Sequence, residues 1–232
     1  MRAGWHRGRH TSGVTDTAAD FVRSYAALAP LGFLPEIKLH QADEPIGLWE
    51  LTEGEYRSEQ PPPFWAFAWA GGQALARYVL DHPETVAGRR VLDLASGSGL
   101  VAVAAALSGA ASVRAVDIDP FSAAAIGLNA AANGAEVSVD RADILGGDAD
   151  GAEVVLAGDV FYSQVMADRM TGFLRRAAKA GARVLVGDPD RAFLPRPLFR
   201  ELAAYDVPTT MALESVTVKH TRVWELRGPA QA

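Results

Sequence analysis

From residue 90 onward, short apolar runs alternate with segments whose apolar residues recur at helical spacing. The segment 164–179 repeats its apolar positions every three or four residues and places its arginines on other faces, which predicts an amphipathic helix. Strands that alternate with helices or compact loops predict a parallel sheet covered on both faces. The runs that predict its strands are RVLDL, SVRAV, VSV, EVVLAG and ARVLVG.

Both ends of the chain depart from this alternation. Residues 16–28 carry apolar positions at helical spacing and predict a short helix that packs as an appendage. EIKLH and GLWEL then alternate apolar with polar residues and predict a pair of strands outside the core. At the other end, PTTMALESV and HTRVWEL follow each other with no helix-length segment between them, which predicts an antiparallel pair. The fold expected is α/β, doubly wound and mostly parallel.

Prolines and glycines mark the division of the chain. Three prolines at 61–63 predict a rigid extended connector. The stretch FWAFAWAGG follows and ends in two glycines that can admit a close backbone approach, and a helix is expected over 72–81. We therefore expect a disordered tail over 1–14, an N-terminal helix and strand pair over 15–63, and a main domain over 64–228.

Composition excludes several classes of function. A formal net charge of −6 argues against broad binding of nucleic acid. The absence of cysteine excludes disulfides and thiolate metal sites, and no apolar stretch approaches the ~20 residues of a membrane span. We expect a cytoplasmic protein, with the mitochondrial matrix as the alternative if the basic N-terminus is a transit peptide. The histidines show no metal-like spacing, so no metal is expected, and His40 and His220 are expected to be structural or surface groups.

In VLDLASGSGL an acid ends a strand, and a run of small residues precedes the next helix. Small residues let a ligand touch the backbone, and a helix N-terminus offers free N–H groups to a carboxylate. S-adenosylmethionine carries a carboxylate and an amine, and Asp93 is placed to meet the amine. The loop also satisfies the dinucleotide pattern G-x-G-x-x-[GA], but Asp93 would repel a pyrophosphate. The residues expected to bind the cofactor here are Asp93, Ala95, Ser96, Gly97 and Gly99.

Two further acids follow the next two strands. In AVDIDP, Asp117 stands at the strand tip, where an acid can accept both hydroxyls of a ribose, with Ile118 beside it. Asp117 is preferred to Asp119, which is expected to face solvent. In DRADIL, Asp143 is placed to accept from the amine of adenine, and Ile144 to cover the ring. The alternative for Asp143 is a helix or turn cap.

The residues after EVVLAG should face the methyl group that is transferred, because ligands of open α/β sheets collect at the carboxyl ends of the strands. Gly158 ends that run, Asp159 can orient an incoming amine, and the next strand similarly delivers residues 188–191. Aromatic residues can form a collar that attracts the amine and the sulfonium through cation–π contacts. The alternative is that Trp65 and Phe67 belong to the core. The collar would consist of Tyr162, Phe161, Trp65 and Trp69.

Five segments together resemble the electron transfer flavoprotein beta subunit lysine methyltransferases over about residues 35–226: PPPFWAFAWAGGQALARYVLDHP, VLDLASGSGLVAVAAALSGA, AVDIDP, LAGDVFYS and VLVGDP. The resemblance implies a seven-stranded, Rossmann-like class I methyltransferase that uses S-adenosylmethionine. It also implies a protein lysine as acceptor. The D-x-x-Y motif of the family falls on Asp159 and Tyr162, which are then the expected catalytic residues.

Two positions depart from the pattern of this family. Ala95 replaces the first glycine of the cofactor loop, where its methyl group should only narrow the loop. Ser163 stands where these enzymes often have an acid after the tyrosine, which affects the expected substrate more than cofactor binding.

Several readings stay open at this point. The acceptor could be the electron transfer flavoprotein beta subunit, a ribosomal protein or a small molecule, and a non-enzymatic scaffold that only binds S-adenosylmethionine is the rival from another class. No nucleic-acid or membrane partner is expected, and a monomer is expected. The sequence identifies neither the target lysine nor the number of methyl groups added.

Overall fold

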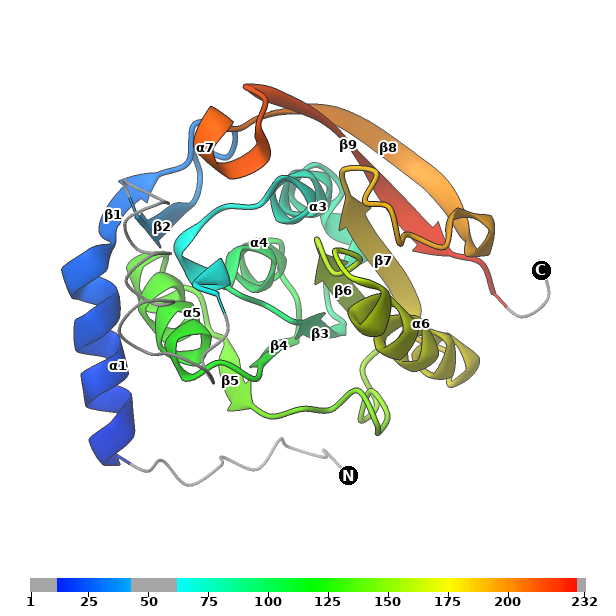
Figure 1. Cartoon of the computed structure of the whole chain (residues 1–232). Helices are drawn as coiled ribbons and strands as arrows, with labels where there is room; N and C mark the ends of the chain where they lie inside the picture. The colour runs from blue at the N-terminus through cyan, green and yellow to red at the C-terminus, as the bar shows by residue number, and fades with distance from the viewer. Residues whose placement is uncertain (1–11, 43–61, 229–232) are drawn as a thin grey trace.

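The computed structural model describes residues 12–42 and 62–228, and its centre is a mixed sheet of seven strands (Figure 1). The strand order is β5-β4-β3-β6-β7-β9-β8. The first five of these are parallel neighbours, whereas β9 pairs antiparallel with both β7 and β8. The doubly wound, mostly parallel fold with an antiparallel closing pair is confirmed. The strands are β3 (Arg90–Leu94), β4 (Ser112–Asp117), β5 (Ser138–Arg141), β6 (Val154–Gly158), β7 (Arg183–Asp188), β8 (Phe199–Pro208) and β9 (Val218–Leu226).

Helices cover the two faces of the sheet because apolar residues of each central strand alternate between them. Val91 of β3 packs in the same buried cluster as helices α3 and α4, whereas its neighbour Leu92 packs with α6. Figure 1 shows α3, α4 and α5 on one side of the strands and α6 on the other. The amphipathic helix expected over 164–179 is confirmed. The helices are α3 (Ala70–Asp81), α4 (Leu100–Leu107), α5 (Pro120–Ala132) and α6 (Gln164–Lys179).

The N-terminal segment consists of α1 (Ser12–Tyr25), β1 (Ala27–Pro30) and β2 (Lys38–Gln41). The helix expected over 16–28 ends at Tyr25, and the chain continues directly into β1, which pairs antiparallel with β2. The partner of the EIKLH strand is therefore residues 27–30. GLWEL, the partner that the sequence suggested, lies outside the described residues. The division at 1–14, 15–63 and 64–228 stays a prediction.

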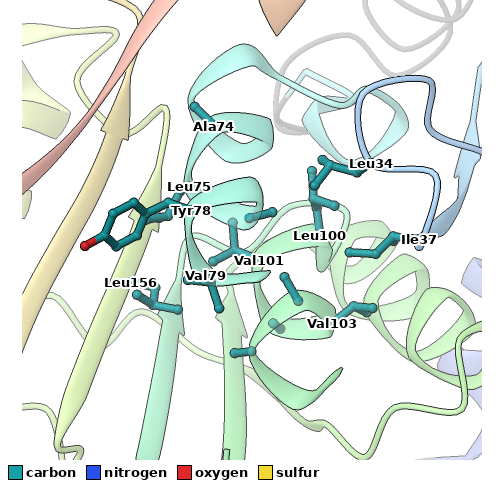
Figure 2. Close-up of a cluster of buried hydrophobic side chains, with 14 of the residues drawn as sticks. Leu34, Ile37, Ala74, Leu75, Tyr78, Val79, Leu100, Val101, Val103 and Leu156 are labelled. Atoms are coloured by element: carbon teal, nitrogen blue, oxygen red, sulfur yellow. The ribbon is translucent and has the colours of Figure 1, made fainter. Parts of the chain in front are cut away.

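This segment shares the core of the main sheet. Leu34 and Ile37, in the turn between β1 and β2, are fully buried in the cluster that holds α3 and α4. Figure 2 shows both side chains beside Leu100 and Val103 of α4. The turn between β1 and β2 is thus part of this hydrophobic core, whereas Val22 of α1, the helix expected to pack as an appendage, is buried in a separate cluster with Trp65 and Ala125.

The strand expected over PTTMALESV is wrong. The strand that pairs with β9 is instead β8 (Phe199–Pro208). The short helix α7 (Met211–Glu214) lies in the connection between β8 and β9. The register of β8 against β9 shifts between Glu201 and Ala203. Because such a bulge interrupts the alternation of a strand, FRELAAYDVP carries a weak strand signal.

Helix α3 lies on the ends of β6 and β7 with backbone against backbone. A Cβ atom on Gly71 would stand 2.4 Å from the carbonyl oxygen of Gly187, and one on Gly158 would stand 2.7 Å from the Cα of Gly72. The close approach expected at the two glycines of FWAFAWAGG is confirmed. No described helix is both long enough and apolar enough to cross a membrane.

Candidate active site

A cavity of about 290 Å³ opens at the carboxyl ends of the parallel strands, where the chain turns outward in opposite directions from β3 and β6. Such a switch point is where open α/β sheets bind ligands. Twelve of the thirteen residues expected to form the site line this cavity. Gly99 does not, because it starts α4 behind the loop, with φ 81° and Ile126 3.1 Å from where its Cβ would be. The twelve are Trp69, Asp93, Ala95, Ser96, Gly97, Asp117, Ile118, Asp143, Ile144, Gly158, Asp159 and Tyr162.

The loop after β3 is built around the buried carboxylate of Asp93. Its Oδ2 accepts hydrogen bonds from the Ser96 hydroxyl at 2.5 Å and from the Ala102 N–H at 3.0 Å. Burial, helped by the charge of Asp117, raises the pKa of Asp93 to about 7. Ala95 has φ 53° and Gly97 has φ 56°, so the loop turns tightly through two left-handed residues. Ala95 therefore adds backbone strain to the loop as well as a methyl group.

Asp117 and Asp119 have different tasks. Asp117 accepts from the Gly97 N–H at 2.8 Å and from the Asp119 N–H at 3.0 Å, so it joins the two loops of the cavity. Burial raises its pKa. Asp119 caps α5 by accepting from the N–H groups of Phe121 and Ser122. The expectation that Asp119 faces solvent is wrong, since it is only 5% exposed.

Three further residues surround this side of the cavity. The apolar side chain of Ile118 is 63% exposed at the cavity wall, as a group that covers a flat ligand would be. Asp143 accepts from the Leu145 N–H at 3.1 Å and pairs with Arg169 at 2.7 Å, and this pairing lowers its pKa. The turn cap considered for Asp143 is therefore present. A contact of Asp143 and Ile144 with adenine stays a prediction.

The aromatic collar differs from the one expected. Trp65 and Phe161 are buried in hydrophobic clusters away from the cavity, so their place in the collar is wrong. Trp69 and Tyr162 do line it, and the ring of Phe64 lies between them, with centroids 5.7 Å and 5.4 Å away. Phe64, which sequence reasoning missed, begins the short helix η1 (Phe64–Ala66), and Phe67 follows three positions later on the cavity wall. This three-residue spacing in FWAFAW was the available signal.

At the acceptor side, Asp159 follows β6 with φ 58° and a side chain only 8% exposed. It accepts from the Gly71 N–H and from the Arg191 Nε at 2.8 Å. Arg191 also pairs with Glu214 of α7 at 2.6 Å and lies over the Trp69 ring at 5.9 Å. Burial raises the pKa of Asp159, and the Arg191 guanidinium acts against that rise. Glu214 was missed because its segment was expected to be a strand.

The charges of the cavity favour a cationic ligand. Five aspartates line it, and its two arginines, Arg169 and Arg191, are each already paired with one of them. An amine or a sulfonium would be attracted by the remaining carboxylates. A pyrophosphate would be repelled by them. The lining acids are Asp93, Asp117, Asp119, Asp143 and Asp159.

The histidines of the described residues lie away from this cavity. His40 Nδ1 is 2.8 Å from the side-chain oxygen of Asn129, and His220 Nδ1 is 2.9 Å from Asp206 at the surface, so the structural and surface roles expected for them are confirmed. Within the described ranges, no three His, Cys, Asp or Glu side chains are grouped as metal ligands would be.

Comparisons with known proteins agree with this geometry. A model of the family "Ribosomal protein L11 methyltransferase (PrmA)" matches residues 73–181. The electron transfer flavoprotein beta subunit lysine methyltransferase of Danio rerio is 39% identical over 82% of this chain and 75% of its own length. The enzyme of that name from Xenopus laevis is 38% identical over 70% of this chain and 68% of its own length.

Solved structures show the same fold. A putative RNA methyltransferase from Pyrococcus horikoshii has a TM-score of 0.55 at 15% identity and covers 77% of this chain and 96% of its own. The magnesium protoporphyrin IX methyltransferase of Synechocystis with bound S-adenosylmethionine has a TM-score of 0.51 at 14% identity and covers 78% and 96%. At these identities the likeness concerns the fold alone.

Proposed function

The chain belongs to the electron transfer flavoprotein beta subunit lysine methyltransferases, and we propose that it methylates a lysine of that beta subunit. It is therefore a protein-lysine methyltransferase that uses S-adenosylmethionine. The observation that carries the proposal is the acidic cavity whose aromatic wall stands beside Asp159 and Tyr162. A cationic donor and an ammonium-bearing acceptor both fit such a wall.

The residues around the loops after β3 and β4 fit the donor. Asp93 and the backbone from Ser96 to Gly97 would hold its amino-acid end, and Asp117 its ribose. Ile118 and Ile144 would cover the adenine, with Asp143 at its amine. S-adenosylmethionine supplies a methyl group activated on a positively charged sulfur.

The acceptor lysine must lose a proton before its nitrogen can form the new bond to the methyl carbon, because its unperturbed pKa is about 10.4. Asp159 would orient the amine, and Tyr162 with Phe64 and Trp69 would surround it. The enzyme then contributes mainly alignment and proton removal. Methyl transfer leaves a neutral sulfur, and the released proton passes to solvent.

Incubation of the enzyme with labelled S-adenosylmethionine and purified electron transfer flavoprotein tests the proposal. Label on a lysine of the beta subunit, located by mass spectrometry, supports it. Purified ribosomal protein L11 serves as the competing substrate, because the family model that matches residues 73–181 is named for it. Label on that protein alone, or only on small molecules of a cell extract, would refute the substrate proposed here. No label under any condition would favour the non-enzymatic scaffold.

The setting of the reaction stays a prediction. We propose that the enzyme works as a monomer, in the cytoplasm or, if the basic N-terminus is a transit peptide, in the mitochondrial matrix. The chain contains no cysteine, which is compatible with the cytoplasm and with the mitochondrial matrix, because both are reducing.

A further inference from the structure

Arg191 joins three segments of the acceptor side that are distant in the sequence. It follows β7, its guanidinium contacts Asp159 after β6, and it contacts Glu214 in the connection between β8 and β9. We propose that Arg191 is a positioning residue that fixes the Asp159 carboxylate for the acceptor lysine, and that Glu214 holds Arg191 in place. This inference rests on the function proposed above, in which Asp159 orients the amine.

The geometry leaves the Asp159 side chain little freedom. Nε and Nη2 of Arg191 both lie 2.8 Å from Oδ1, while Oδ2 accepts from the Gly71 N–H. Arg191 is itself held at both ends. Its backbone N–H donates to Asp188 at 2.7 Å, and its two terminal nitrogens lie 3.2 Å and 2.6 Å from the two oxygens of Glu214. Such a bidentate pair fixes direction as well as distance.

The pairing also controls the charge of Asp159. The charged groups around it are Arg191, Glu214 and Asp188, and Lys219 lies 3.4 Å from Glu214. Burial raises the pKa of Asp159, the charge of Glu214 adds to that rise, and Arg191 opposes it. Without Arg191, the carboxyl group would take up a proton at a higher pH. A neutral carboxyl group would lose its attraction for an ammonium ion.

A purely structural role makes a different prediction from a positioning role. Breaking a buried ion pair by removing one partner commonly destabilises a protein strongly, and that loss lowers activity equally at every pH. A residue that keeps Asp159 ionised instead changes the pH at which activity is lost. It also affects turnover without affecting the binding of S-adenosylmethionine.

The test compares wild type with Arg191→Gln, Arg191→Lys and Glu214→Gln. Turnover on the electron transfer flavoprotein beta subunit is measured from pH 6 to 9, and S-adenosylmethionine affinity by calorimetry. Arg196→Gln is the matched control, because Arg196 lies on the same loop and pairs with Asp190 at 2.9 Å but does not line the cavity.

For Arg191→Gln we expect turnover near neutral pH to fall about 10- to 100-fold, the scale of a small misplacement of a reacting group. The acidic limb of the profile should move upward by about one pH unit, the scale of losing one nearby charge. Donor affinity should stay within about twofold of wild type. Arg191→Lys should restore part of both changes. Glu214→Gln should lower turnover by a smaller factor, because Arg191 is then held less firmly, but it should not move the acidic limb upward, because the charge that it removes raises the pKa of Asp159.

In Arg191→Gln, an acidic limb that stays in place, or a loss of turnover equal at all pH values, would overturn the inference. Should Arg191→Gln fail to fold, the acidic limb of Arg191→Lys and the turnover of Glu214→Gln decide: wild-type values of both would overturn the inference. If wild type fails to methylate the beta subunit, the proposed function fails and this inference with it. If wild type is active and the variants keep its profile, only the inference fails.

Discussion

The two halves of the cavity are built differently. On the donor half, short loops after β3 and β4 hold one another through carboxylates that accept backbone N–H groups, as Asp117 does from Gly97. On the acceptor half, the side chains of Asp159, Arg191 and Glu214 come from three separate connections and hold one another by charge. The donor half is thus fixed by local backbone, and the acceptor half by long-range contacts. We expect the donor half to tolerate distant changes and the acceptor half to transmit them.

The largest effect should come from the predicted catalytic pair. Asp159→Asn should lower turnover by about 10²-fold or more, and Tyr162→Phe by less, while donor affinity changes little. Melting temperature alone cannot separate the roles of Asp159, because the carboxylate also accepts from Gly71 and Arg191. Tyr162 is 47% exposed and is the cleaner probe. Wild-type rates in both variants would disprove the assignment.

The backbone contact beneath the acceptor half gives the next largest effect. Gly71→Ala places a Cβ 2.4 Å from the Gly187 carbonyl oxygen and should cost about 1–3 kcal/mol or more in the free energy of unfolding. Gly72→Ala is the matched control, because nothing lies within 4 Å of its Cβ position. It should stabilise α3 by up to about 1 kcal/mol through helix propensity. Urea unfolding of both variants measures the difference, and equal stabilities would contradict the close contact.

On the donor half, two neighbouring acids should separate binding from stability. Asp117→Ala should weaken donor binding by about 1–3 kcal/mol, the scale of hydrogen bonds to a charged group. Asp119→Ala removes a helix cap and should cost about 0.5–2 kcal/mol of stability with little change in affinity. Calorimetry and urea unfolding on both variants are sufficient. The reverse pattern would assign the ribose to Asp119.

Donor binding should also depend on pH through Asp93. In the folded protein the pKa of Asp93 is about 7, above its value of 3.8 in the unfolded chain. As pH rises from about 4 to about 7, Asp93 loses its proton in the unfolded chain but keeps it in the folded protein, so its contribution to folding stability falls over this range. A cationic donor favours the ionised form, so its affinity should rise several-fold from pH 6 to 7.5. Asp93→Asn, which keeps an acceptor for Ser96 and Ala102, should remove this rise. An equal rise in both proteins, measured by calorimetry, would exclude Asp93 as its source.

The smallest effect is expected at Ala95. Ala95→Gly relieves a left-handed alanine, worth about 1–2 kcal/mol, but adds about 0.5–1 kcal/mol of unfolded-state entropy. The net gain in stability should be about 0.5 kcal/mol, with donor affinity nearly unchanged. Thermal unfolding of the two proteins checks the sign. A loss of stability would mean that the alanine methyl makes contacts that outweigh the strain.

Sequence reasoning succeeded where the determinants are local. The acid and small residues from Asp93 to Gly97 lie within five consecutive positions at one strand end, and the loop can be identified from them. The pairing of Arg191 with Glu214 depends on how β8 and β9 fold, and the bulge in β8 concealed that arrangement. Trp65 and Trp69 lie in the same aromatic stretch, and the sequence does not distinguish their environments. The turn of η1 buries Trp65 in the core and leaves Trp69 on the cavity wall.

The position of α3 also bears on how the chain folds as it is synthesised. The helix contacts β6, β7, β8 and β9, and β9 is among the last elements of the chain. Contacts between residues so far apart form slowly, because the intervening chain must be ordered first. During synthesis, the face of α3 that carries Gly71 therefore stays uncovered until β7 and β9 have been made, more than a hundred residues later. Until β7 and β9 emerge, this helix has no strands to pack against. In that interval we expect the nascent chain to be most prone to aggregation and to chaperone binding.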